Sequence, residues 1–132
     1  MEKEMKTFLA LAFVATLSNH AVAEVPCAGG SPDLFKFVKW ELKTVDAQTT
    51  EITLTVHNTT NQNFKESEIK IRWGEWQQFF FYFRTLAKAN SDATFVNSFG
   101  MHAESAKMLQ ALVPTLCTVK TFDESDNKQN YD

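Results

Sequence analysis

Apolar and polar residues alternate along several short segments of the chain, which is the pattern of strands with one buried face. The clearest examples are "VKWELK" at 38–43, "EITLTVH" at 51–57 and "EIKIRW" at 68–73. Polar turns separate them, and threonine and β-branched residues favour strands. We therefore predict a strand in each segment. The positions expected to be buried are Val38, Trp40, Leu42, Ile52, Leu54, Val56, Ile69, Ile71 and Trp73.

The period changes to that of a helix in "HAESAKMLQALV", residues 102–113. Alanine, leucine and valine recur there at helical spacing among strong helix formers. Pro114 ends the segment because proline cannot continue a helix. Residues 93–99 and 115–122 alternate again and are predicted strands. The polar tail at 123–132 is predicted to be disordered.

Together these elements predict a mainly β fold, an antiparallel sandwich of six to seven strands with one helix before the last strand. The strand, polar turn and strand of "EITLTVHNTTNQNFKESEIKIRW" resemble the pattern of many bacterial immunoglobulin-like domains. The resemblance implies an immunoglobulin-like β-sandwich for a single domain at 24–122, and it assigns no functional residue. The alternative is an α+β fold in which an antiparallel sheet packs on helices.

The segment "WGEWQQFFFYFRTL", residues 73–86, contains five consecutive aromatic residues. Such a run favours a strand over a helix, so odd and even positions lie on opposite faces. A two-residue loop after Trp73 would leave three phenylalanines on the polar face, whereas a three-residue loop leaves Phe80 and Tyr82 there. An exposed phenylalanine forgoes about 1.5–3 kcal/mol. We therefore predict a three-residue loop at 74–76. The core-facing residues are then Phe79, Phe81 and Phe83.

With this register, the outer face of the hairpin carries aromatic rings surrounded by cationic side chains. Aromatic residues and arginine are enriched where proteins contact one another. Two other roles for this face stay open. The chain's own helix at 103–113 could cover it, or Trp73, Trp76 and Tyr82 could stack on a sugar. The predicted partner-binding residues are Lys70, Arg72, Trp76, Phe80, Tyr82 and Arg84.

The first 23 residues have the parts of a secretory signal peptide. Lys6 precedes an apolar run at 7–17, and Ala21-Val22-Ala23 is a small-x-small cleavage site. The run is about half of the ~20 residues that span a bilayer. We expect cleavage before Glu24 and a soluble periplasmic or extracellular protein. It would touch a membrane only through the uncleaved signal peptide.

Cys27 and Cys117 are the two cysteines of the chain. An even count in an exported protein predicts a disulfide. The bond would tie the N-terminal segment to the last strand, and a loop of this length stabilises by about 4–5 kcal/mol. The alternatives are a metal pair or a reactive thiol.

Few residues suggest a catalytic, metal-binding or nucleic-acid-binding site. The net charge of −3 and the lack of a basic cluster argue against nucleic acid as a partner. His57 and His102 are not part of a clear metal or catalytic pattern, so we expect no metal, no cofactor and no enzyme activity. Asn58-Thr59-Thr60 is a glycosylation sequon.

The sequence thus favours an exported binding protein of the cell envelope. An inhibitor, an immunity protein against an exported toxin, and an accessory subunit of an envelope machine fit equally. Its partner would be another protein, and pairing with a second copy is a further option. The alternative function is a small carrier that holds an apolar ligand in a cavity lined by phenylalanines, between sheet and helix.

Overall fold

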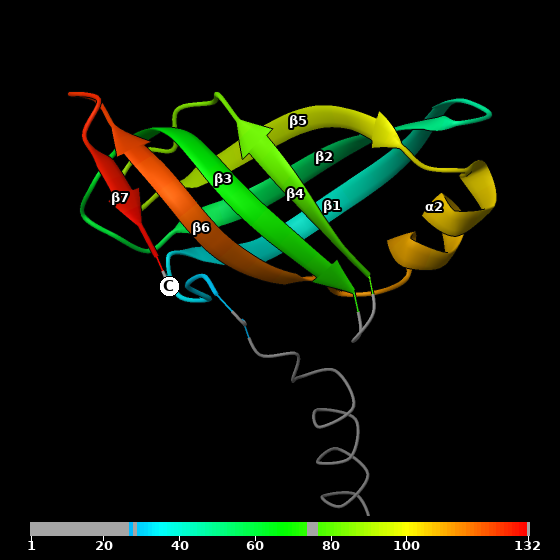
Figure 1. The fold of residues 1–132 in the computed structure, drawn as a ribbon, viewed down its shortest axis with the longest axis horizontal. Coiled ribbons are helices and arrows are strands. Elements are labelled where there is room, and N and C mark those ends of the chain that lie inside the picture. Colours follow the sequence, from blue (N-terminus) through cyan, green and yellow to red (C-terminus); the bar gives the residue numbers. More distant parts are fainter. Residues whose placement is uncertain (1–26, 28, 74–76, 132) are drawn as a thin grey trace, which may run out of the picture.

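Two antiparallel sheets face each other in the computed structural model, which describes residues 27, 29–73 and 77–131 (Figure 1). The first sheet has the order β1-β2-β5, with β1 at Phe35–Asp46, β2 at Thr49–Asn58 and β5 at Asp92–Gly100. The second has the order β4-β3-β6-β7, with β3 at Phe64–Trp73, β4 at Gln77–Phe83, β6 at Thr115–Asp123 and β7 at Lys128–Asn130. Helix α2, Ala103–Gln110, connects β5 to β6.

This arrangement confirms the predicted β-sandwich with one helix late in the chain. Three strands, β1, β2 and β5, face β3, β6 and β7, as strands A, B and E face C, F and G in an immunoglobulin domain. The remaining strand, β4, joins the second sheet at its edge. None of the described helices is long and apolar enough to cross a membrane. The predicted signal peptide at 1–23 lies outside the described residues.

The end of the chain differs from the disordered tail that we predicted at 123–132. Residues 128–130 form β7, which pairs with β6 from Lys120 to Phe122. The Asp123 side chain builds the connecting turn, because its Oδ1 accepts hydrogen bonds of 2.9 Å from the backbone N–H groups of Ser125 and Asn127. The polar composition of this segment therefore encodes a turn followed by a short strand.

The first strand contains a bulge that the alternation did not reveal. The register of β1 against β2 shifts between Phe37 and Lys39. Val38, predicted to be buried, is 45% exposed, whereas Trp40 is 8% exposed. The predicted core positions of β2 and β3 are all buried.

Aromatic rings join the two sheets across the core. Phe83 of β4 stacks on Phe95 of β5 with ring centroids 4.7 Å apart, and Trp40 of β1 stacks on Trp73 of β3 at 5.1 Å. Phe99 meets the ring of Phe81 edge-on at 5.0 Å. Many of the aromatic side chains therefore pack between the two sheets and stabilise their contact.

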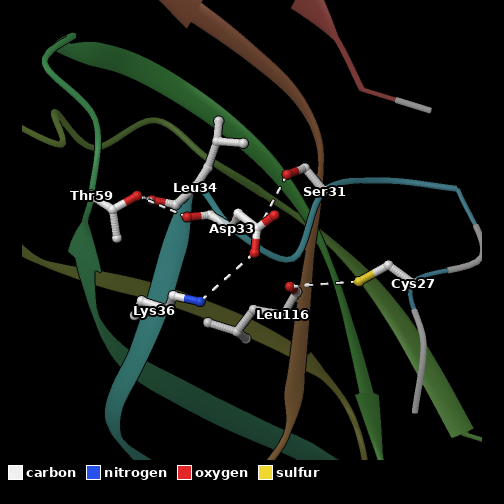
Figure 2. A network of polar contacts seen from close by, with 7 residues as sticks. All are labelled: Cys27, Ser31, Asp33, Leu34, Lys36, Thr59 and Leu116. Carbon is white, nitrogen blue, oxygen red and sulfur yellow. Dashed lines mark hydrogen bonds and ion pairs between the residues drawn. The ribbon is translucent and has the colours of Figure 1, made fainter. Parts of the chain in front are cut away.

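The residues before β1 lie against β6 and are bonded to it covalently. The predicted disulfide between Cys27 and Cys117 is present. Ser31 and Thr118 exchange two backbone hydrogen bonds of 2.8 Å. Figure 2 shows the continuation of this segment, where Thr59 Oγ1 donates to the carbonyl oxygen of Asp33 at 2.8 Å. We call residues 27 and 29–33 the N-terminal strap.

Candidate protein-binding surface

The hairpin of β3 and β4 has the predicted register. Trp73 pairs with Gln77, so the connecting loop comprises residues 74–76, which lie outside the described part of the chain. Ile69 pairs with Phe81, and both point into the core. Lys70 pairs with Phe80 on the opposite, outer face. The position of Trp76, a predicted contact residue, lies outside the described residues.

The exposed fractions of the side chains separate the two faces of β4. Phe81 and Phe83 are 3% and 1% exposed, whereas Phe80 is 59% exposed and Tyr82 is 38% exposed. Two neighbouring aromatic side chains therefore lie open on a sheet face. We call the outer surface of β3 and β4 around Phe80, Tyr82 and Arg84 the aromatic face.

Acidic residues share this face, which corrects the expectation of cationic surroundings. Glu68 lies directly opposite Tyr82, and Arg84 Nε is 3.7 Å from Glu66 Oε1. On the neighbouring strand, Lys120 Nζ is 3.6 Å from Glu68 Oε2. The signal was present in the sequence, because Glu66 and Glu68 alternate in step with Lys70 and Arg72, which places them on the same face of a strand. The charges around the rings are therefore mixed and paired.

Tyr82 interacts closely with this charged rim. The Arg84 guanidinium carbon lies 5.6 Å from the centre of the Tyr82 ring, within the range of a cation–π contact. The pKa of the Tyr82 phenol is raised above its usual value. Desolvation is the largest cause, and a hydrogen bond with Glu66 is the second. The hydroxyl therefore remains protonated at neutral pH and can donate a hydrogen bond.

Lys70 is not on the open surface that the sequence predicted. Its side chain is buried, and its Nζ donates a hydrogen bond of 3.0 Å to the carbonyl oxygen of Gly29 in the N-terminal strap. Lys70 pairs with Cys117 on β6, so the disulfide holds the strap over it. Arg72, the other predicted cation of β3, is half-buried.

Helix α2 does not cover the aromatic face. It packs on β1 and β2 of the first sheet, at one end of the sandwich (Figure 1). The Gln110 side chain anchors it there, donating from Nε2 to the Trp40 carbonyl oxygen at 3.0 Å and accepting from the Leu42 N–H at 2.5 Å. The buried side of the helix consists of Ala106 and Leu109. The intramolecular cover that we considered for Phe80 and Tyr82 is thus contradicted.

Within the part of the chain that the structure describes, the other candidate sites are not formed or have structural roles. Trp73 is 3% exposed in the core, so it is unavailable to a sugar-stacking platform. Asn58 of the sequon is fully buried and donates to the carbonyl oxygens of Gln62 and Ala87 at 2.9 and 3.2 Å. It therefore organises the turn after β2, and its amide is inaccessible in the folded domain. Among the described residues, no three His, Cys, Asp or Glu side chains gather as metal ligands would.

The described structure contains two shallow pockets in which polar and apolar side chains are mixed. One of about 270 Å³ lies on the first sheet and is lined by Lys39, Trp40, Glu41, Thr53, Thr55 and Thr94. The other, of about 420 Å³, is lined by Leu34, Thr60, Asn61, Gln62, Phe64, Gln129 and Tyr131. Only one phenylalanine borders either pocket.

Comparison of the chain with protein-family models, with curated proteins and with solved structures finds no match.

Proposed function

We propose that the protein is an exported binding domain that engages another protein through its aromatic face. The observation that carries the proposal is the open position of Phe80, 59% exposed beside the half-exposed Tyr82 on a regular strand. Burying such a ring under a partner contributes about 1.5–3 kcal/mol. An inhibitor, an immunity protein and an accessory subunit of an envelope machine all fit this surface.

The rim of the aromatic face suits protein recognition. Protein interfaces commonly have an aromatic centre, where charged residues are depleted, and a polar rim that stays near water. Here Arg84, Glu66 and Glu68 surround the rings and already have partners within the chain. A protein partner would therefore bury the rings without having to neutralise a strong charge of one sign.

The disulfide supports the exported location. Disulfides persist in oxidising compartments and are rare in the cytosol. The Cys27–Cys117 bond has a Cα–Cα separation of 5.6 Å, which lies within the common range for disulfides. We infer a periplasmic or extracellular protein from this bond together with the signal-peptide pattern of the first 23 residues.

Ring packing favours the binding function over the carrier alternative. A carrier would need phenylalanines that line free space, yet Phe79, Phe81 and Phe99 contact one another with centroids 5.0–6.3 Å apart. Detergent-free native mass spectrometry of the purified protein addresses the carrier directly. A stoichiometric lipid or pigment that copurifies with the domain would support the carrier.

Capture from envelope extract tests the binding function. The immobilised domain should retain a partner, and combining Tyr82→Ala with Arg84→Ala should remove most of it, because both side chains belong to the aromatic face. Val96→Ala is the matched control, since Val96 is 56% exposed on β5 of the other sheet. Equal capture by the double variant and the control would refute the assignment of this face.

A further inference from the structure

In the described part of the chain, no strand pairs with the outer edge of β4 in the second sheet. Strand β4 pairs with β3 on one side and ends the sheet on the other. Its sequence, "QQFFFYF", has no charge, proline or glycine. Proteins usually protect a sheet edge with lysine, proline, a bulge or a covering element, because a bare edge pairs with other strands.

Two other edges show such protection. Strand β1 carries lysines at 36, 39 and 43 and has a bulge. In addition, the Gln110 side chain of α2 forms hydrogen bonds with the β1 backbone at Trp40 and Leu42. Strand β7 has three residues, of which Lys128 is charged. The uncharged edge of β4 differs from both, and it also differs from the remaining edge strand, β5, which carries a charge at Asp92.

Hydrogen bonding within the sheet shows which backbone groups of β4 face outward. Thr118 of β6 exchanges both of its bonds with Ser31, on the side away from β3. Ile69, opposite Thr118, must then direct its N–H and C=O to β4, where it faces Phe81. Phe81 is consequently bonded inward, and its neighbours Phe80 and Tyr82 present their N–H and C=O to the open edge.

A side chain confirms this direction independently. Asn97 Nδ2, which comes from β5 of the first sheet, donates to the Tyr82 carbonyl oxygen at 3.4 Å. That oxygen can therefore be reached from outside the second sheet. Since a carbonyl oxygen has two lone pairs, the contact with Asn97 leaves it able to accept a second bond.

We propose that β4 pairs antiparallel with β4 of a second copy, about a two-fold axis at Phe80. With this axis, the outward-facing residues 78, 80 and 82 of one chain lie opposite 82, 80 and 78 of the other. Each of these is a hydrogen-bonded pair, which gives about six backbone bonds. The axis lies at the centre of β4, so all residues of Gln77–Phe83 overlap.

The side chains fit this register as well as the backbone does. On the outer face Phe80 would meet its own copy, and Gln78 would meet Tyr82 of the other chain. Aromatic cross-strand pairs stabilise a sheet, whereas like charges directly opposite each other destabilise it. Because β4 has no charged residue, pairing it with β4 of a second copy places no like charges opposite each other. A second copy is therefore a complementary occupant of this edge.

Pairing would create one continuous sheet with four strands from each copy. The two aromatic faces would lie side by side on it, and an isologous two-fold interface closes without leading to a fibre. This inference goes beyond the proposed function and does not depend on it, since self-association needs no other protein.

Sedimentation velocity of the exported protein tests the pairing. We expect a dimer whose fraction rises with concentration. Combining Gln78→Glu with Tyr82→Lys should preserve or strengthen it, because opposite charges then meet across the axis. Within each chain, the new carboxylate at position 78 lies opposite Arg72, and the new ammonium group at position 82 lies opposite Glu68.

The matched variant combines Gln78→Lys with Tyr82→Lys, which places like charges opposite each other between chains. It should weaken association by about fivefold to tenfold relative to the first variant. A protein that stays monomeric at all concentrations, or two double variants that associate equally, would overturn the proposed pairing. A monomer that still captures a partner from extract would leave the proposed function standing.

Crosslinking checks the axis in case a charged variant does not fold. Phe80→Cys should form an interchain disulfide under mild oxidation, because its two copies meet at the axis. Gln78→Cys should not, since its two copies would lie four residues apart along the strands, about 14 Å. Equal crosslinking of both variants would exclude this register.

Discussion

Phe81 and Tyr82 are neighbours in the chain and lie on opposite faces of β4. Phe81 is 3% exposed and packs between Phe79, Phe83 and Phe99, so Phe81→Ala should lower the free energy of unfolding by about 3–5 kcal/mol. Tyr82→Ala should cost far less because the side chain is 38% exposed. Parallel denaturant titrations measure both. Equal losses would mean that both faces of the strand are buried in solution.

Two adjacent glycines of the N-terminal strap offer a second test at the residue scale. Both have positive φ angles, +81° at Gly29 and +117° at Gly30. A Cβ at Gly30 would lie 3.2 Å from Cys117 Cβ and from the Thr118 carbonyl oxygen, whereas a Cβ at Gly29 meets nothing within 4 Å. Both alanine variants carry backbone strain, and Gly30→Ala adds two contacts that are tighter than ordinary van der Waals contact.

Gly30→Ala should therefore destabilise the domain by at least about 1 kcal/mol more than Gly29→Ala. Thermal unfolding of the two oxidised variants provides the measurement. If Gly29→Ala is the more harmful change, the strap does not lie on β6 at Cys117 as described.

At the element scale, the turn between β6 and β7 should respond to acid. Hydrogen bonds from the Asn127 backbone are the main cause of the lowered pKa of Asp123. A carboxyl whose pKa is lower in the folded state stabilises that state above its unfolded value, here 3.8, and the stabilisation disappears as pH falls through the folded value. Residues 128–131 should thus lose amide protection as pH falls below 3.8 and through the lower folded-state pKa of Asp123.

Asp123→Asn is the control for this pH effect, because the amide keeps an acceptor oxygen and does not titrate in this range. Hydrogen exchange followed by NMR would show a weaker acid response in the variant. An unchanged response would assign the transition to a group other than Asp123.

The strands could be predicted from sequence where burial follows the local period. The alternation of Ile52, Leu54 and Val56 locates a half-buried strand, and the cost of exposing three phenylalanines selects the register of β4. The same reasoning wrongly predicts that Val38 is buried. A bulge adds one residue and shifts the alternation there, and the composition of the segment gives no sign of it.

Contacts between distant segments could not be predicted in this way. The even position of Lys70 correctly places it on the outer face, yet its burial depends on Gly29, 41 residues away in the chain. Likewise, the amphipathic pattern of α2 requires a partner surface but does not select β1 over the aromatic face. The sequence pattern of one segment does not determine which distant segment packs against it.

At the scale of the whole molecule, the disulfide connects the N-terminal strap to β6 across a sequence separation of 90 residues. Cys27→Ser should lower stability by about 2–5 kcal/mol, as loss of a native bridge in a small secreted domain does. Denaturant unfolding of this variant beside the oxidised native protein gives the value. Native cysteines that react with an alkylating reagent before reduction would contradict the bond.

The central position of β6 in the second sheet has a consequence for synthesis. A ribosome delivers the chain from its N-terminal end, so β1, β2 and β5 can assemble while β6 is still unmade. Until then the β3–β4 hairpin has two unpaired edges, because its neighbour β6 comes later in the chain than β3, β4 and β5. A holding chaperone that shields this aromatic hairpin until β6 has been synthesised would therefore raise the yield of the native protein.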